Sequence, residues 1–256
     1  MTTRPATDVL ARCVDLVAAA EPRCGGTVVV AVDGPSGSGK SSVSRAVARR
    51  FGLRYLDTGA MYRALTWWCL DQDVDLADRD AVVRAMDELP LAMGTDPAAP
   101  SVFVGAVDVG EAIRQTRVSE QVSAVATNLD VRARMRDLQR RLIGEAGGGV
   151  VAEGRDITTV VAPDADVRVL LTASEQARLE RRARELHGHA ELDAVESTRD
   201  QVVRRDRDDS TVSQFVTAAD GVHTIDSSAM RFEEVVDTLS ALVTRLTGRE
   251  PVVESR

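Results

Sequence analysis

A glycine-rich segment with one lysine is the part of the chain whose residue types most directly imply chemistry. Residues 34–41, GPSGSGKS, fit the pattern G-x-x-x-x-G-K-[ST]. Glycines let backbone N–H groups turn inward around a phosphate, and the start of a following helix adds partial positive charge there. We expect Lys40 to reach the β- and γ-phosphates of ATP and the Ser41 hydroxyl to ligate Mg²⁺. The residues predicted to contact the nucleotide are Gly34, Pro35, Ser36, Gly37, Ser38, Gly39, Lys40, Ser41 and Ser42.

The identity of the basic residues supports this interpretation. The chain has 32 Lys and Arg residues, and Lys40 is the only lysine among them. Such a strong preference for arginine suggests a bias against lysine codons, so the position that kept lysine should need an ammonium group that guanidinium cannot replace. Chance survival of one lysine is the alternative, which its place in the motif disfavours.

A second segment, residues 55–63 with the sequence YLDTGAMYR, has the features of a strand end followed by a helix start. Thr58 offers a hydroxyl there, and Arg63 lies about one turn into the helix, where its guanidinium could bind a phosphate through two hydrogen bonds. A surface arginine is the alternative on spacing alone.

The elements that position these motifs alternate along the chain. Apolar β-branched runs predict strands, and 3.6-residue periodicity predicts the helices between them. The predicted strands are 27–32, one ending near 57, 150–152, 167–171 and 222–225; the predicted helices are 7–20, 41–51, 61–70, 81–89, 131–143, 175–186 and 231–246. This order predicts an α/β fold with a mainly parallel sheet and helices on both faces.

Two stretches interrupt that alternation. Residues 89–110 contain three prolines beside an alternating apolar run and predict a small β insertion. Residues 176–209 are dense in both charges, which is typical either of a solvated helical pair or of a basic flap over phosphates.

Taken together, the motifs GPSGSGKS, LDTGAMYR, EGRDITTVVAPDA and RRDRDDST resemble bacterial cytidylate kinases, also called CMP/dCMP kinases, from about Val28 to Leu246. The resemblance implies an α/β P-loop NTPase three-layer core with a parallel sheet, a monophosphate-binding insertion and an arginine-rich helical lid. The expected division is an N-terminal helix and linker (1–26) and one kinase domain (27–256), with core 27–57, 150–174 and 216–250, insertion 58–149 and lid 175–215.

The resemblance also implies roles for individual residues. Thr58 and Asp209 would contact the acceptor ribose. Arg63, Arg155 and Arg205 would hold the CMP phosphate, and Ser123, Arg132 and Asp156 would read the cytosine edge. Lys40, Arg155 and Arg205 would be the catalytic residues.

Three points stay open at this stage. Arg155 and Asp156 could pair only with each other. Glu153 could hold a water on Mg²⁺ or cap a turn. Val212 stands where the family pattern has a further lid arginine, so we expect a slow but genuine enzyme.

Composition limits the alternatives. The formal net charge is −8, a poor match for binding long nucleic acid, whose affinity comes from a basic surface. No apolar run is long enough to span a membrane. Three cysteines without metal-ligand spacing indicate reduced thiols in a cytoplasmic protein. We expect a monomeric ATP- and Mg²⁺-dependent kinase acting on CMP and dCMP. The alternatives are a P-loop kinase for UMP, a nucleoside or an unusual metabolite, and a nucleotide-binding module that has lost phosphotransfer.

Overall fold

The computed structural model describes residues 26–187 and 206–252, without the side chains of 185–187. The predicted N-terminal helix, the middle of the predicted lid and Arg205 lie outside these residues. Within them, every helix is too short or too polar to cross a lipid bilayer.

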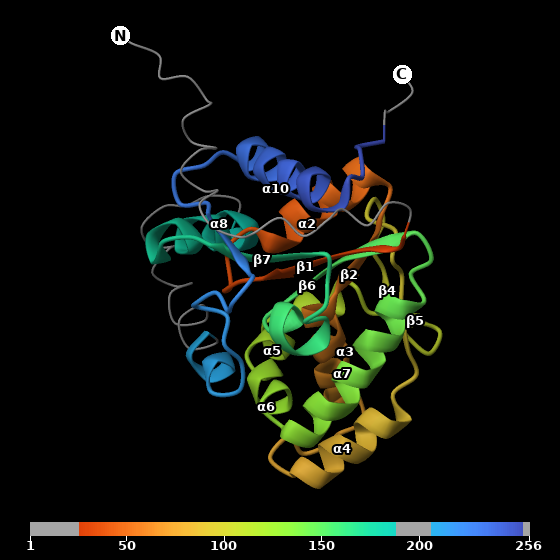
Figure 1. Ribbon diagram of the computed structural model, residues 1–256. Helices are drawn as coiled ribbons and strands as arrows, with labels where there is room; N and C mark the ends of the chain where they lie inside the picture. Colours follow the sequence, from red (N-terminus) through yellow and green to blue (C-terminus); the bar gives the residue numbers. More distant parts are fainter. Residues whose placement is uncertain (1–25, 188–205, 253–256) are drawn as a thin grey trace.

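A five-stranded parallel sheet forms the centre of the molecule, in the order β2-β6-β1-β7-β8 (Figure 1). Its strands are β1 (Val28–Asp33), β2 (Arg54–Asp57), β6 (Gly149–Gly154), β7 (Val167–Thr172) and β8 (His223–Asp226). β1 lies in the middle and pairs in parallel with β6 and β7. Because all strands run the same way, their carboxyl ends meet at one edge of the sheet. The predicted parallel sheet is confirmed, with strand boundaries shifted by at most two residues.

Helices cover both faces of the sheet, giving three layers. On one face, α2 (Lys40–Phe51) and α10 (Phe232–Thr247) share an apolar cluster with the sheet that includes Val47, Phe51 and Leu239. On the other face, α3 (Thr58–Asp71) and α7 (Leu129–Gly144) pack through Met61 and Met135. Figure 1 shows the two helical layers on opposite sides of the strands, with α8 (Glu175–His187) beside α2. The core is therefore built mainly from aliphatic side chains, as the low aromatic content requires.

The predicted β insertion is also confirmed. β3 (Leu91–Met93), β4 (Val102–Val104) and β5 (Val107–Asp108) form a small antiparallel sheet after α4 (Arg79–Glu88). Short helices η1 (Ala112–Arg114), α5 (Thr116–Ser119) and α6 (Val122–Ala126) lead from this sheet to α7. A third apolar cluster joins the insertion to α3 through Trp67, Val104 and Ile113.

Candidate active site

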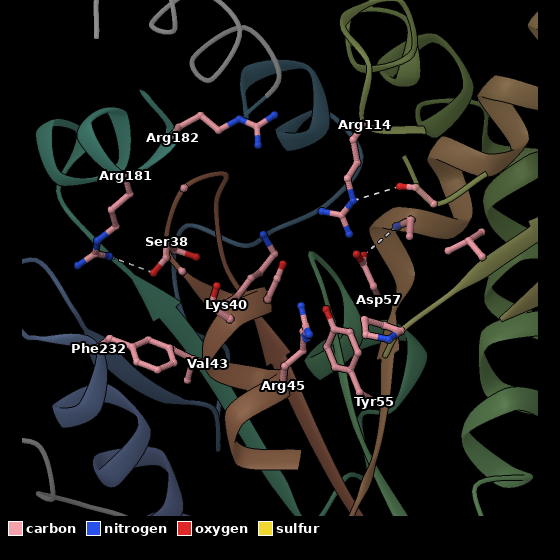
Figure 2. Close-up of a pocket in the computed structure, with 18 of the residues that line it drawn as sticks. Ser38, Lys40, Val43, Arg45, Tyr55, Asp57, Arg114, Arg181, Arg182 and Phe232 are labelled. Carbon is pink, nitrogen blue, oxygen red and sulfur yellow. Dashed lines mark hydrogen bonds between the residues drawn. The ribbon is translucent and has the colours of Figure 1, made fainter. Parts of the chain in front are cut away.

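The candidate residues gather at the carboxyl edge of the parallel sheet, around two cavities. The larger cavity, about 1060 Å³, lies over the P-loop between α8, α10 and the insertion, and Figure 2 shows it. The smaller, about 160 Å³, lies between the P-loop, α3, α6 and the segment after β6. Six residues line both cavities and so lie where molecules bound in the two cavities would meet. They are Gly37, Lys40, Ser41, Asp57, Arg114 and Arg182.

The P-loop has the backbone that phosphate binding requires. Gly37 and Gly39 have φ angles of 75° and 88°, a left-handed conformation that favours glycine. A Cβ on Gly37 would lie 2.6 Å from the carbonyl oxygen of Arg178, so α8 approaches the loop closely. α2 begins at Lys40, and its first N–H groups have no acceptor within the helix. The loop therefore combines free donors with the positive end of a helix.

Lys40 lies at the end of this loop, with its Nζ 3.4 Å from the carbonyl oxygen of Pro35. Figure 2 shows Lys40, Arg114 and Arg182 extending toward the same space from the P-loop, the insertion and α8. Three cationic groups from three separate parts of the chain thus surround the place where both cavities meet.

Glu153 at the end of β6 lies behind the P-loop and is buried. The Tyr55 hydroxyl donates to its Oε1 at 2.7 Å. Burial, and then the nearby Asp57, raise the pKa of Glu153, whereas Lys40 and a hydrogen bond with Ser41 oppose that shift. Glu153 therefore contacts the Ser41 hydroxyl, which the sequence predicts as a Mg²⁺ ligand.

The donor set around Ser41 fits a magnesium ion bound together with a nucleotide. Ser41 supplies a hard oxygen ligand, with the Glu153 carboxylate next to it. Among the described residues, no three His, Cys, Asp or Glu side chains group closely enough to hold a metal by themselves. A cation there would take most of its ligands from phosphate oxygens and water.

The acceptor cavity begins at the junction of β2 and α3. Asp57 caps α3 by accepting from the Ala60 N–H and pairs with Arg63 at 3.1 Å. The Nε of Arg63 is buried and has no hydrogen-bond partner among the described residues. A guanidinium with an unsatisfied donor at a cavity wall is suited to an anion such as a phosphate. Thr58, buried at the same junction, donates its hydroxyl to the Glu153 carbonyl oxygen at 2.7 Å.

Two of the three residues predicted to read the base, Arg132 and Asp156, line this cavity as a polar pair. Arg132 on α7 pairs with Asp156 and also donates to the Ser213 hydroxyl at 2.7 Å. Burial is the main cause that raises the pKa of Asp156, and Arg132 opposes it. Ser123 lies on α6 and is half-buried, but it is not among the residues that line the cavity, whereas its neighbour Val122 is.

Arg155 does not pair with Asp156, which answers one of the open alternatives. Its guanidinium pairs with Asp209 and lies 3.3 Å from an oxygen of Asp206. It also lies over the ring of Phe215, 4.6 Å from the centroid, a cation–π contact. The segment that follows Val212 therefore supplies a hydrophobic support for Arg155 and, through Ser213, a partner for Arg132.

A buried carboxylate holds the segment that carries Arg155 and Asp156. Asp33, at the end of β1, accepts from the N–H groups of Ile157 and Thr158 and from the Thr158 hydroxyl, at 2.6–2.9 Å. Burial raises the pKa of Asp33 to about 6, although these hydrogen bonds oppose the shift. Asp33 is thus a positioning residue that ties the P-loop strand to the acceptor site.

Sequence reasoning missed several residues of this site. Arg114, Arg178, Arg182, Asp206, Ser213 and Phe215 contact the site or line it, and none received a role from the sequence. Arg114 received no role because nothing local marks it, and Arg178 and Arg182 of α8 were visible only as members of a charge run.

The fold and the site together define a P-loop phosphotransferase with an acceptor cavity beside the nucleotide cavity. The sequence profile of the cytidylate kinase family matches residues 30–245. The chain is 45% identical to a cytidylate kinase of Streptomyces avermitilis over 84% of this chain and 92% of that protein. It is 48% identical to a cytidylate kinase of Rhodococcus opacus over 87% of this chain and 97% of that protein. The chain belongs to the cytidylate kinase family.

Proposed function

We propose that the protein transfers the γ-phosphoryl group of ATP to the phosphate of CMP or dCMP, giving ADP and the nucleoside diphosphate. The observation that carries the proposal is the meeting of a P-loop cavity and an arginine-lined acceptor cavity at Lys40, Arg114 and Arg182. The family match favours CMP over the other acceptors that the sequence left open, and it gives no support to a binding module without activity.

The reaction needs positioning and charge neutralisation more than proton transfer. An oxygen of the acceptor phosphate attacks the γ-phosphorus while the bond to the β-phosphate oxygen breaks. The acceptor is already an anion, so no general base is required. Lys40 and the P-loop N–H groups would hold the donor phosphates, and Arg63 and Arg155 the acceptor phosphate. Mg²⁺ bound near Ser41 would supply further neutralisation of the phosphate charge.

The Arg132–Asp156 pair supports cytosine as the base. Cytosine presents an exocyclic amine next to acceptor atoms, so a carboxylate beside a guanidinium matches its edge. Uracil presents a carbonyl in place of the amine and would leave Asp156 facing another acceptor. Leaving a buried polar group unpaired costs about 1–3 kcal/mol, or roughly 5- to 150-fold in selectivity.

The test is a coupled assay of ADP release with CMP, dCMP, UMP, AMP and cytidine offered in turn as the acceptor. We expect turnover with CMP and dCMP, weaker turnover with UMP and none with cytidine. Asp156→Ala should reduce the CMP-to-UMP ratio of kcat/KM toward unity while the affinity for ATP stays within about 2-fold. Asp164→Ala, which changes an exposed aspartate after η2 (Ile157–Val161), is the matched control and should leave the ratio unchanged. Equal use of UMP and CMP by the native protein would contradict the base assignment.

We further propose that the protein acts as a cytoplasmic monomer. Light scattering coupled to size-exclusion chromatography would give a mass near 27.5 kDa if this is right and a multiple of that mass if it is wrong.

A further inference from the structure

Asp206 is held against the P-loop by three donors from three separate segments. Its Oδ1 accepts from the N–H of Ser36 at 3.0 Å and lies 3.3 Å from Nη1 of Arg155. Its Oδ2 pairs with Arg178 on α8. The side chain is only 14% exposed, so this carboxylate is largely removed from water.

The three donors form a site suited to a phosphoryl group. Backbone N–H groups of a P-loop and arginine guanidiniums are the groups that proteins use to bind phosphates. Ser36 also lines the acceptor cavity, as does Arg155, so the site lies on the wall that faces the acceptor. A side-chain carboxylate here has the charge and the acceptor geometry of part of a phosphoryl group.

The carboxylate leaves part of this site unsatisfied. Nη1 of Arg178 donates to the Ser36 carbonyl oxygen at 3.0 Å as well as to Asp206. The Nε of Arg178 is buried and has no hydrogen-bond partner among the described residues. Asp206 offers two oxygens, which already accept from three groups, whereas a phosphoryl group offers three oxygens. A phosphoryl group therefore offers one more acceptor oxygen than the carboxylate that now occupies the site.

Charge balance points the same way. Arg155 and Arg178 lie beside Asp206 and Asp209, so two guanidiniums face two carboxylates. A phosphoryl group with two negative charges would be repelled while Asp206 stays in place. Once that carboxylate has moved away, the two guanidiniums and Asp209 leave one net positive charge, which attracts the phosphoryl group instead.

We propose, on the basis of the proposed function, that the Ser36 N–H, Arg155 and Arg178 form a cradle for the phosphoryl group under transfer. In the structure described here, the Asp206 carboxylate occupies this cradle in place of that phosphoryl group. Arg178 is then a catalytic residue of the reaction. Asp206 competes with the phosphate-bearing substrate, so its removal should tighten substrate binding rather than weaken it.

Isothermal titration of four single ligands with Asp206→Asn tests the competition. Asparagine keeps the shape and can still accept from Ser36 N–H, but it lacks the charge. We expect ATP, which carries the phosphoryl group under transfer, to bind about 10-fold more tightly, in line with one charge-assisted hydrogen bond. ATP compared with ADP isolates the γ-phosphate, and CMP compared with cytidine isolates the acceptor phosphate.

Asp208→Asn is the matched control, because Asp208 is a close neighbour of Asp206 in the chain and its ion-pair partner is the exposed Arg207. It should bind all four ligands as the native protein does. Unchanged or weaker binding of ATP by Asp206→Asn, or a gain for CMP alone, would overturn the proposal.

Steady-state kinetics test the second half of the proposal. Arg178→Ala should lower kcat by roughly 10²-fold with a smaller change in KM, as expected when a charge that acts in the transition state is lost. Arg178→Lys should recover part of kcat. Arg184→Ala, on the exposed side of α8, should be indistinguishable from the native enzyme. A kcat of Arg178→Ala equal to that of Arg184→Ala would overturn the catalytic role.

The two arms separate this proposal from the proposed function. If the native protein turns over no monophosphate, the proposed function fails, and the binding arm still decides whether Asp206 competes with a phosphate. If the native protein is active and neither arm responds, the function stands and the cradle is wrong.

Discussion

At the scale of single residues, Asp33 shows how a group that touches no substrate controls the site. Its carboxylate accepts three hydrogen bonds from Ile157 and Thr158, directly after the two residues that face the acceptor cavity. Burial raises its pKa to about 6, above the ordinary value of 3.8. The folded protein therefore binds this proton more tightly than the unfolded chain does. Stability from this group is fully present below about pH 3.8, falls as pH rises toward 6, and is constant above that.

This sign gives a pH prediction. The shift of about two pKa units corresponds to about 3 kcal/mol of unfolding free energy. Urea unfolding of native protein and Asp33→Asn should show a difference in stability that changes by up to this amount between pH 4 and 7. Taking the difference cancels the contributions of the other titrating groups.

Protonation of Asp33 below pH 6 also weakens it as the acceptor of three hydrogen bonds, so the KM for CMP should rise below that pH. A pH-independent difference would contradict the assignment, and Asp164→Asn is the exposed control.

Sequence reasoning found the residues of the P-loop because their types are strongly constrained. Only glycine adopts the φ values at 37 and 39 without strain, and Lys40 stands out because it is the only lysine in the sequence. Arg178 and Asp206 stayed hidden because their roles depend on which of many arginines and aspartates the fold brings together. A charge run has the same composition whether its members face solvent or the P-loop.

At the scale of elements, the segment after residue 206 illustrates the same limit. Residues 206–210 are helical, and the N–H of Val212 donates to the Asp209 carbonyl oxygen as the chain turns away. Ser213 then reaches Arg132, and Phe215 lies under Arg155. The sequence interpretation took Val212 as a departure from the family pattern. It did not predict that the following residues support two site arginines, because those contacts join parts of the chain 60 to 81 residues apart.

Val212→Arg should therefore raise turnover. A new guanidinium at this turn would lie close to a cavity already lined by Ser213 and Asp209, where negative charge develops during transfer. Since Arg155 and Arg178 are present, we expect an increase in kcat on the order of 10-fold rather than the much larger effect of a sole arginine. KM for CMP should change little, because the acceptor site is intact.

Val216→Arg provides the matched control in steady-state kinetics. Val216 is 70% exposed in the same segment, so an arginine there adds the same charge without facing the cavity. A native kcat that is already high, together with no response to Val212→Arg, would show that the lid needs no further arginine.

At the scale of the whole molecule, the division of the core into clusters determines which parts can be weakened separately. One cluster holds α2 and α10 against the sheet and supports the P-loop. Another joins the insertion to α3, and Ile113 is fully buried within it. Alternation of strands and helices was enough to predict the layers, because apolar periodicity is local. The packing of the insertion against α3 could not be predicted from the sequence, because it depends on contacts between segments that are distant in the chain.

This separation predicts that damage to the insertion core falls mainly on the acceptor. Ile113 lies in η1, and the helices that follow it present Ser119, Val122 and Ala126 to the acceptor cavity. Ile113→Ala should cost about 2–5 kcal/mol of unfolding free energy, and Ile113→Val about 0.5–1.5 kcal/mol. Titration calorimetry should show a larger loss of affinity for CMP than for ATP in both variants, in proportion to these costs. Val47→Ala, which opens space in the cluster under the P-loop, should show the opposite order. Equal losses for both ligands in both variants would mean that the clusters act as one cooperative unit, and the separation argued from their packing would be wrong.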